Sequence, residues 1–361
     1  MNFFRFSLRR DNNSGIILIV VLWLTVILSV MAMGLSRQIG VEIQLTRYAL
    51  AKVQSKAAAI SGLAYAKAQM AWLSLADDVS EGETQYRLGF HLLEDQTPED
   101  LFKDIEVGNN RFSIGYTRDD GSDNRELIFG FRAEESRLNL NAIGPQNYRI
   151  LGDLLTLMGL DQDTADQIAV ALVDWRDADN VVLIPTVGAE DDYYLSLENP
   201  YPCKNGSLES LEEFLAVRGV TPEIFEQISR FLTVMPTEGP LGINFSTASR
   251  EVLLALARYY AGARTNTELS DAESLVDKIL LHRCGDDGVE ATADDRPVRL
   301  VGMPLNMKER VIALTMQKHQ VPSSRYLRIK ITGEEPRTGI TAIIETVIDR
   351  ESFSVLSWRR H

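Results

Sequence analysis

Cysteine and histidine are scarce in this sequence. Its 361 residues include 2 cysteines, Cys203 and Cys284, and 4 histidines. Two thiols cannot form a four-thiolate zinc site, although they could form one disulfide in an exported domain. The sequence also lacks G-x-S-x-G, phosphate-loop, G-x-G-x-x-G, H-E-x-x-H and C-x-x-C motifs. These absences favour a protein that is not an enzyme.

Positive charge is also in short supply and is unevenly placed. The chain has 37 Lys and Arg against 51 Asp and Glu, a net charge of −14, yet residues 1–75 carry net +6. An acidic chain repels phosphate backbones, so we expect no nucleic-acid partner. Apolar residues at 45% and charged residues at 24% exclude a disordered or collagen-like chain.

Charge is absent altogether from residues 16–35. A helix of that length spans about 30 Å, enough to cross a bilayer. A cleavable signal peptide is the competing interpretation, since Ala32 and Gly34 resemble a cleavage site, but signal peptides have apolar regions of only about 7–15 residues. We therefore expect a retained, single-pass membrane helix, with arginines before it favouring a cytoplasmic N-terminus.

The helical pattern continues beyond the membrane segment. Residues 36–75 contain no proline and are rich in good helix formers. Apolar residues at steps of three to five suggest a stripe that packs on the chain's own β-sheet: Ile39, Ile43, Tyr48, Val53, Ala57, Ile60, Ala64, Ala68 and Trp72. One helix over residues 16–75 would be about 90 Å long.

The rest of the chain reads as strands interrupted by helices. Alternating apolar residues predict a hairpin over 112–131, and further strands at 327–332, 339–350 and 353–359. Helical patterns fill the middle, at 147–159, 163–175, 209–218, 222–234, 247–261, 271–283 and 306–317. The sequence therefore predicts a β-rich domain with an inserted helical one.

The inserted region contains an approximate internal repeat. The stretch LNLNA at 138–142 resembles INFSTA at 243–248, and the helix ending at Asp177 resembles the one ending at Cys284, 107 residues on. Such paired turns are typical of helix-hairpin-helix and SAM-like modules. Those modules often contact DNA, but the acidic loops here favour a structural role.

Acidic residues gather in one loop of the insert. Carboxylates packed together repel unless a cation joins them, and calcium prefers six to eight oxygen ligands from flexible loops. The EF-hand pattern fails, because Val181 occupies a ligand position. We nevertheless predict a calcium site from Asp174, Asp177, Asp179, Glu190, Asp191 and Asp192, with a weaker second cluster of Asp286, Asp287, Asp294 and Asp295. The alternatives are a solvated acidic loop or an acid/base pair for glycoside cleavage.

Several stretches resemble one known family. Residues 14–23 (SGIILIVVLW) look like a type IV prepilin leader junction, where a basic leader ends in glycine before an apolar helix. The stretches VDWRDAD, GAEDDYY, SLEEFLAVRG and INFSTA, which begin at residues 173, 188, 210 and 243, are similar to those of the K-type minor pseudopilins of type II secretion. The resemblance runs nearly end to end.

The resemblance implies an α+β fold. A long N-terminal helix, transmembrane and then periplasmic, packs on a pseudopilin β-sheet that carries a large inserted all-α domain of SAM-like or helix-hairpin-helix type. The implied segments are a leader (1–15), a membrane helix (16–35), the pseudopilin helix and first strands (36–143), the doubled helical insert (144–318) and C-terminal strands (319–361).

The resemblance also implies processing and partners. Family members are cut after the leader glycine, here Gly15, by the prepilin peptidase, and the new N-terminus, here Ile16, is methylated. Most pilins carry Glu five residues after the cut; Val20 stands there, which suits a subunit placed first. The family forms a tip complex with I-type and J-type minor pseudopilins and other pseudopilins, and binds calcium in its acidic loops.

Two other functions stay open from the sequence. One is a membrane-anchored periplasmic hydrolase that uses the acidic cluster, and the other is a tip protein of a DNA-uptake pilus. For an inner-membrane protein with a periplasmic body, we also expect a disulfide between Cys203 and Cys284, since the periplasm is oxidising.

Overall fold

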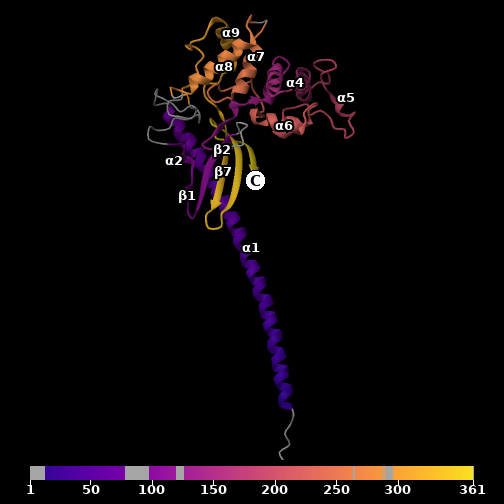
Figure 1. Cartoon of the computed structure of the whole chain (residues 1–361), viewed down its shortest axis with the longest axis vertical. Coiled ribbons are helices and arrows are strands. Elements are labelled where there is room, and N and C mark those ends of the chain that lie inside the picture. The colour runs from indigo at the N-terminus through magenta and orange to yellow at the C-terminus, as the bar shows by residue number, and fades with distance from the viewer. Residues whose placement is uncertain are drawn as a thin grey trace, which may run out of the picture.

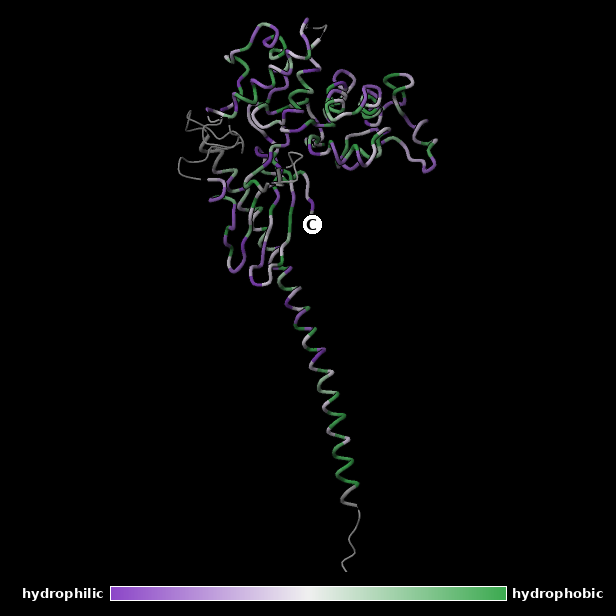
Figure 2. Tube along the Cα trace, viewed as in Figure 1, coloured by the Kyte–Doolittle hydropathy of each residue, from purple (hydrophilic) through white to green (hydrophobic). Residues whose placement is uncertain are grey.

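A computed structural model describes residues 13–77, 97–118, 126–262, 265–286, 288 and 296–360. Helix α1 (Asn13–Asp77) has 65 residues and projects from the body of the molecule (Figure 1). Within these described ranges, one helix is long and apolar enough to cross a membrane, and its most apolar window is not buried. Figure 2 shows that this window forms the lower part of α1, farthest from the body. Leader residues 1–12 lie outside the described ranges.

The upper part of α1 packs on a β-sheet through small side chains. The buried positions of α1 are Ala51, Ser55, Ala58, Ala59, Gly62, Ala66 and Met70. The stripe predicted from the sequence is wrong, because Val53, Ile60 and Trp72 are all exposed. The helix lies too close to the sheet for large side chains: a Cβ on Gly333 of the sheet would come within 2.2 Å of the Ser55 carbonyl oxygen.

The sheet is antiparallel and combines strands from both ends of the chain. Its order is β1 (Ile105–Val107), β2 (Asn110–Arg118), β7 (Tyr326–Glu335), β8 (Ile340–Asp349) and β9 (Val355–Arg360), with β3 (Glu126–Phe129) paired to β2 and β4 (Arg132–Ala133) to β7. Alternate residues of β2, β7 and β8 face α1 and form its core, namely Phe112, Ile114, Ile329, Ile331, Ile344 and Ile348. The predicted hairpin, C-terminal strands and α+β architecture are confirmed.

A helical region lies between β5 (Leu138–Asn139) and β7, and it sits beyond the sheet at the end of the molecule opposite the start of α1 (Figure 1). Its α-helices are α3 (Arg149–Leu157), α4 (Gln162–Arg176), α5 (Asp191–Tyr194), α6 (Pro222–Ile228), α7 (Arg250–Tyr260), α8 (Leu269–Arg283) and α9 (Met307–Met316). The predicted helix at 209–218 is the 3-10 helix η4 (Leu211–Ala216). The short helix α2 (Pro98–Phe102) lies outside this region, before β1.

Side-chain caps fix where several of these helices begin. Thr221 caps α6 and is followed by a proline in the first turn, as its sequence predicts. The predicted helix 222–234 is too long, however. After Ile228 the chain forms a 3-10 turn, η5 (Ser229–Phe231), and then β6 (Leu232–Thr233), which pairs in parallel with β5.

The two helix pairs α3–α4 and α7–α8 share several features. Helices α4 and α8 each have 15 residues, and an arginine ends each one. Arg176 donates to the carbonyl oxygens of Leu140, Asn141 and Ile143, and Arg283 donates to that of Ala248. In both halves, an arginine thus ties the end of the second helix to the segment that precedes the first.

A buried ionic network joins the sheet to the helical region. Glu134, in the 3-10 turn η2 (Glu134–Ser136), accepts hydrogen bonds from Arg328 of β7 at 2.6 Å, from Arg137 and from Thr233. Burial alone would raise the pKa of Glu134, but the charges of Arg137 and Arg328 outweigh it and lower this pKa to about 2. Glu134 is therefore ionised, and it fixes β7 against the turn that leads into the helical region.

Candidate metal centre

Three carboxylates meet where α4 ends and α5 begins. Asp174 lies in the last turn of α4, Asp177 is the residue that caps it, and Glu190 precedes α5. One oxygen atom from each lies within 4.8 Å of the others. The loop of residues 178–189 therefore brings together groups that are up to 16 residues apart in the sequence.

Backbone amides fold this loop around Asp174. The side chain of Asp174 is fully buried, and its oxygens accept hydrogen bonds from the N–H groups of Leu183 at 2.9 Å and Ala189 at 2.8 Å. Gly188 allows this approach, since a Cβ there would lie 2.1 Å from Oδ2 of Asp174. Arg218 donates to the Gly188 carbonyl oxygen at 2.9 Å and secures the loop from outside.

Glu190 and Asp177 have oxygens that the protein leaves without donors. Within the described chain, both carboxylate oxygens of Glu190 and Oδ1 of Asp177 are buried and accept no hydrogen bond from a nitrogen or hydroxyl group. Only 4% of Glu190 is exposed. The thiol of Cys203 lies beside it and is at best a weak donor. Leaving buried carboxylate oxygens unpaired is costly, so their environment is incomplete.

The acidic surroundings perturb all three carboxyl groups. Burial, followed by the charges of Asp177 and Asp174, raises the pKa of Glu190 to about 7. Burial and the neighbouring acids likewise raise the pKa of Asp177, and burial raises that of Asp174. The three groups thus repel each other in their ionised forms, and a bound cation would remove that repulsion.

The donor set fits a hard divalent cation. Three converging carboxylates, two of which have unpartnered oxygens, are the ligand chemistry that calcium uses, with carbonyl groups and water completing its six to eight ligands. Trp175 and Tyr194 pack edge to face beside the cluster, with ring centroids 4.9 Å apart. Both rings are buried, and Trp175 follows Asp174 directly in α4.

The remaining ligands predicted for the first cluster have other partners or positions. Oδ1 of Asp179 accepts from the N–H of Val181 at 2.8 Å, and Oδ1 of Asp191 accepts from the N–H of Cys203 at 2.7 Å. Asp192 is exposed on α5. The structure therefore brings together three of the six predicted residues, and the role of the other three stays a prediction.

The second predicted cluster falls mainly outside the described residues. Asp287, Asp294 and Asp295 lie there. Asp286 is described and exposed, and its carboxylate lies 2.6 Å from the guanidinium of Arg296. A calcium site in this second loop stays a prediction.

The predicted disulfide is not formed. Cys203 and Cys284 are both buried and are not joined to each other. Cys203 packs beside Glu190, whereas Cys284 caps the far end of α8. Burial and the neighbouring carboxylates raise the pKa of Cys203 to about 12, so its thiol is protonated and unreactive.

Sequence reasoning identified the acidic loop but not the residues that hold it. The roles of Gly188 and Arg218 emerge only from the folded loop. The available signal was their chemistry, since a glycine lies within the carboxylate-rich stretch and an arginine follows it in the sequence.

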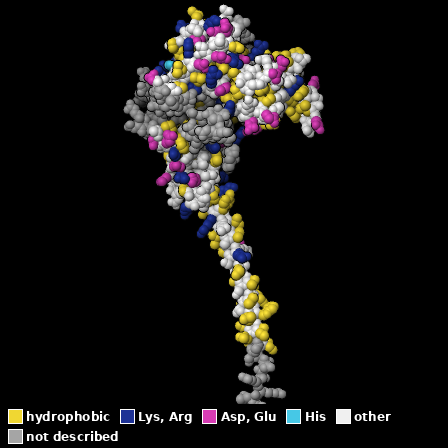
Figure 3. Space-filling view, viewed as in Figure 1, with side chains coloured by type: hydrophobic (Ala, Val, Ile, Leu, Met, Phe, Trp, Pro, Cys, Tyr) yellow, Lys and Arg dark blue, Asp and Glu magenta, His cyan; other side chains and the backbone are white. Residues whose placement is uncertain are grey.

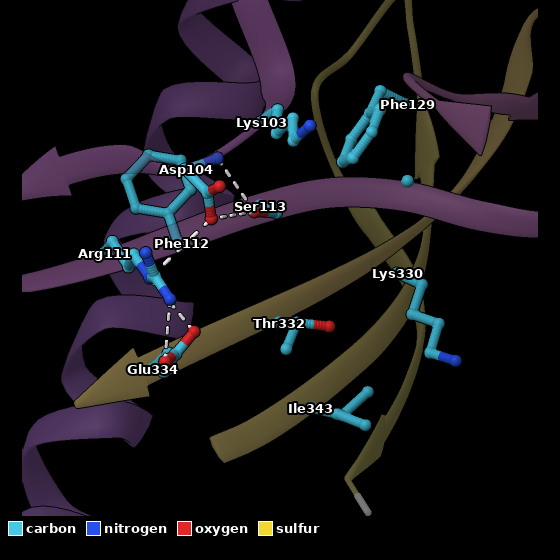
Figure 4. A pocket seen from close by; sticks show the side chains of 11 residues that line it. Lys103, Asp104, Arg111, Phe112, Ser113, Phe129, Lys330, Thr332, Glu334 and Ile343 are labelled. Carbon is cyan, nitrogen blue, oxygen red and sulfur yellow. Dashed lines mark hydrogen bonds and ion pairs between the residues drawn. The ribbon is translucent and has the colours of Figure 1, made fainter. Parts of the chain in front are cut away.

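A separate hollow lies on the sheet face that points away from α1, and Figure 4 shows its lining. It measures about 440 Å³. At its edge, Arg111 donates two hydrogen bonds to Glu334, at 2.9 and 3.0 Å, and lies 3.7 Å from Asp104. The N–H of Asp104 donates to Ser113 at 2.9 Å. These contacts tie β2 and the segment before β1 to β7, which is a structural role.

The predicted processing site lies at the start of α1. Gly15 and Ile16 are within its first turn, and Val20 follows one turn later with 57% of its surface exposed. Figure 3 shows hydrophobic side chains along this part of α1 and Lys and Arg side chains nearer the body. The cut after Gly15 and the methylation of Ile16 stay predictions.

The family model and the known proteins that match this chain carry the same description. Residues 136–237 match the family model described as type II secretion system (T2SS), protein K. Type II secretion system protein K of Pectobacterium carotovorum subsp. carotovorum is 29% identical over 143 residues, or 39% of this chain and 40% of that protein. The protein of the same name from Aeromonas hydrophila is 29% identical over 180 residues, or 44% and 53%.

Two further matches cover more of the chain. The putative type II secretion system protein K of Escherichia coli K12 is 23% identical over 246 residues, which is 65% of this chain and 66% of that protein. A chain in the crystal structure of the GspK–GspI–GspJ complex from the enterotoxigenic E. coli type 2 secretion system aligns with a TM-score of 0.53 and 16% identity. This alignment covers 81% of the present chain and 96% of the other, so the two share a fold.

The chain spans about half, or less, of the length of the first two relatives. The acidic loop lies within residues 136–237, the part that matches the family model. The architecture agrees with that of the solved complex. The chain is therefore similar to the type II secretion system protein K family, in sequence over residues 136–237 and in fold over most of its length.

Proposed function

We propose that this protein is a minor pseudopilin at the tip of the type II secretion pseudopilus. There it helps to initiate assembly and supports the export of folded proteins across the outer membrane. The observation that carries the proposal is the shared architecture, since the alignment covers 96% of a chain from the GspK–GspI–GspJ complex. The proposed role is assembly and not catalysis.

The exposed face of α1 supports a role in assembly. Large apolar side chains are exposed beyond the membrane segment, among them Ile43 (47%), Leu45 (62%) and Val53 (64%). Large apolar side chains that are exposed outside a membrane segment favour an interaction with other proteins. We infer that I-type and J-type minor pseudopilins, and other pseudopilins, pack against it.

Maturation and location follow from the same proposal. The prepilin peptidase would cut after Gly15, leaving Ile16 as a methylated N-terminus. Val20 offers no carboxylate to the N-terminus of a neighbouring subunit, so this chain suits the first position in the assembly. The apolar start of α1 anchors the protein in the inner membrane, and the body lies in the periplasm.

The acidic loop would hold calcium in this arrangement. Asp174, Asp177 and Glu190 are the residues we assign to it, because their oxygens converge and three of them lack donors. The ion would supply positive charge that the loop lacks. A hydrolase is disfavoured, because the relatives that this chain resembles are named as secretion-system proteins.

Co-purification tests the proposed partners. The full chain would be expressed with the I-type and J-type pseudopilins of its own organism, and extracted in mild detergent. We expect the wild-type chain to retain both partners and Val53→Asp to lose them, since burying an unpaired charge in an interface is costly. Leu281→Asp is the control, because Leu281 is similarly exposed (69%) but lies on α8, away from α1. Equal recovery with Val53→Asp would contradict the assigned surface.

A further inference from the structure

A groove lies between α9 and the loop that precedes it. Its volume is about 290 Å³, and it is lined by Leu300, Val301, Met303, Ala313, Leu314 and Arg310. Leu300, Met303 and Ala313 are buried and form its floor. Arg310 is exposed, and its charged side chain is part of an otherwise mainly apolar lining.

The rim of the groove exposes large apolar side chains. Val301 is 73% exposed on the loop, and Leu314 is 60% exposed on α9. Met307, seven residues before Leu314 and therefore on the same helix face, is 78% exposed. A solvent-facing helix surface is normally polar, and apolar side chains gathered around a groove mark a binding surface.

The segment that forms the groove is basic, whereas the whole chain is acidic. Residues 296–319 contain five Arg and Lys and one acid, Glu309, in a chain of net charge −14. Most of these basic groups have partners: Arg296 pairs with Asp286, and Lys308 pairs with Glu268 and Asp271. Lys318 lies over the ring of Tyr260.

Arg310 differs from those neighbours. Within the described residues, no carboxylate pairs with Arg310, and Glu309 next to it is buried and bound by Lys278 at 2.6 Å. An exposed guanidinium at the edge of an apolar groove provides a fixed fork of donors for a carboxylate. The groove thus offers an apolar contact beside a positive charge that no carboxylate of the described chain neutralises.

We propose that this groove binds a segment of a partner protein that carries an apolar side chain beside an Asp or Glu. The apolar side chain fills the space above Leu300 and Met303, and the carboxylate pairs with Arg310. Figure 1 places α9 at the end of the molecule opposite the start of α1. The partner therefore approaches from the side away from the membrane anchor, and the surface is distinct from the face of α1 assigned to other pseudopilins.

Peptide binding to the full chain in zwitterionic nanodiscs tests this proposal. Three fluorescein-labelled peptides of equal length would be compared by anisotropy: one with alternating Leu and Asp, one with Leu and Asn, and one with Ser and Asp. We expect the first to bind, and each of the others to bind at least fivefold more weakly. Raising the salt concentration should weaken binding of the Leu/Asp peptide, because salt screens the contact between its carboxylate and Arg310.

Variants of the groove separate its two contributions. Arg310→Glu should weaken binding of the Leu/Asp peptide at least tenfold, whereas Arg310→Lys should weaken it less, because it keeps the charge and loses the fork of donors. Leu314→Ser should weaken binding through lost apolar contact. Lys56→Glu is the matched control, because it makes the same charge change at an exposed position of α1 and should leave binding unchanged.

Four outcomes would overturn the proposal. The first two are equal binding of the Leu/Asp and Leu/Asn peptides and unchanged peptide binding by the Arg310→Glu variant. The third is binding of phosphatidylglycerol vesicles in preference to the peptide, and the fourth is self-association that Arg310→Glu abolishes, which would assign the groove to a second copy of this chain. None of these results depends on the secretion role, which co-purification with the other pseudopilins tests separately.

Discussion

Glu190 is a glutamate that the fold buries without giving its carboxylate a nitrogen or hydroxyl donor within the described chain. Its neighbours, Asp174 and Asp177, add negative charge within 4.8 Å. A residue in this position destabilises the protein unless a cation binds, so the metal assignment depends on it more than on any other residue.

Calcium should therefore stabilise the wild-type chain. At one hundred times its dissociation constant, a ligand of the folded state adds about 2.7 kcal/mol. Glu190→Gln should lose most of this gain and, without calcium, should be at least as stable as the wild type because a buried charge is removed. The measurement is the melting temperature with calcium and with chelator.

Glu198→Gln is the matched control, since Glu198 is exposed in the same stretch and should keep the calcium response. A wild-type melting temperature that is indifferent to calcium would remove the site. The resemblance to type II secretion system protein K would stand, because it rests on the sequence matches and the fold.

Glu135 is a second buried glutamate, and it lies at the junction of the sheet and the helical region. Its Oε1 accepts from the N–H groups of Arg325 at 2.9 Å and Tyr326 at 3.2 Å, while Oε2 is buried and has no donor among the residues that the structure describes. Burial raises the pKa of Glu135 to about 7, and the charge of Glu134 adds to this effect. Its protonated form is thus favoured in the folded state.

A raised pKa in the folded state fixes the sign of the pH dependence. The contribution of Glu135 to stability is complete below its unfolded-state pKa of about 4.5 and is lost as the pH rises through about 7. Glu135→Gln should keep both backbone contacts without a titrating group. Relative to the wild type, it should gain on the order of 2 kcal/mol between pH 5 and pH 8.

Urea unfolding at those two pH values, with calcium present, would measure the difference. The comparison isolates Glu135, because the other carboxyl groups are common to both proteins. An identical pH dependence in the two proteins would mean that Glu135 is ionised throughout.

The sequence predicted the region of the candidate site more accurately than its members. The density of carboxylates between residues 174 and 198 is visible without a structure. The convergence of Asp174, Asp177 and Glu190 is not, because it depends on amide groups of Leu183 and Ala189 within an irregular loop. No periodicity determines which side chains such a loop turns inward.

At the level of elements, the contact between α1 and the sheet depends on glycine. A Cβ on Gly333 of β7 would lie 2.2 Å from the carbonyl oxygen of Ser55 and 2.4 Å from the amide nitrogen of Ala59. Both atoms belong to the helix backbone, so the helix itself would have to move. Gly333→Ala should therefore destabilise the protein by about 1–3 kcal/mol.

The midpoint of urea unfolding measures this effect. Gly144→Ala provides the control, because a Cβ at Gly144 would meet no atom within 4 Å. It should change stability by less than about 0.5 kcal/mol. If the two substitutions have equal effects, then α1 is not held closely against β7.

Helices with local signals were predicted well, and contacts made at a distance were not. Thr221 and the proline that follows it mark the start of α6 in the sequence. The end of α6 was misplaced, because residues 232–233 leave the helical pattern to pair with β5, almost a hundred residues earlier in the chain. The buried face of α1 was misidentified for a similar reason, since small side chains carry little hydrophobic signal yet allow the closest packing.

At the level of the whole molecule, maturation connects the sequence to the assembled state. The proposed cut after Gly15 removes the leader and makes Ile16 the first residue. Gly15→Leu should block the cut, because the peptidase of this family accepts a small residue there. The intact mass of the purified chain would then be larger by the 15-residue leader.

Gly34→Leu serves as the control for that experiment. It makes the same substitution within α1, at a glycine whose Cβ would meet no atom within 4 Å, and processing should proceed. Finding Ile16 at the N-terminus of the Gly15→Leu protein would contradict prepilin processing at this site.

The pairing of β4 with β7 also has a consequence for how the chain folds. Glu134 and Arg328 are in contact although they are 194 residues apart in sequence, and the helical region begins and ends beside them. Closing a disordered loop of that length costs about 3 kcal/mol more than closing a short turn. If the helical region folds first, it brings its two ends together and β7 meets β2 without that entropic cost. The insert would then nucleate the sheet that carries it, and a destabilised insert would slow sheet formation even where no sheet residue is changed.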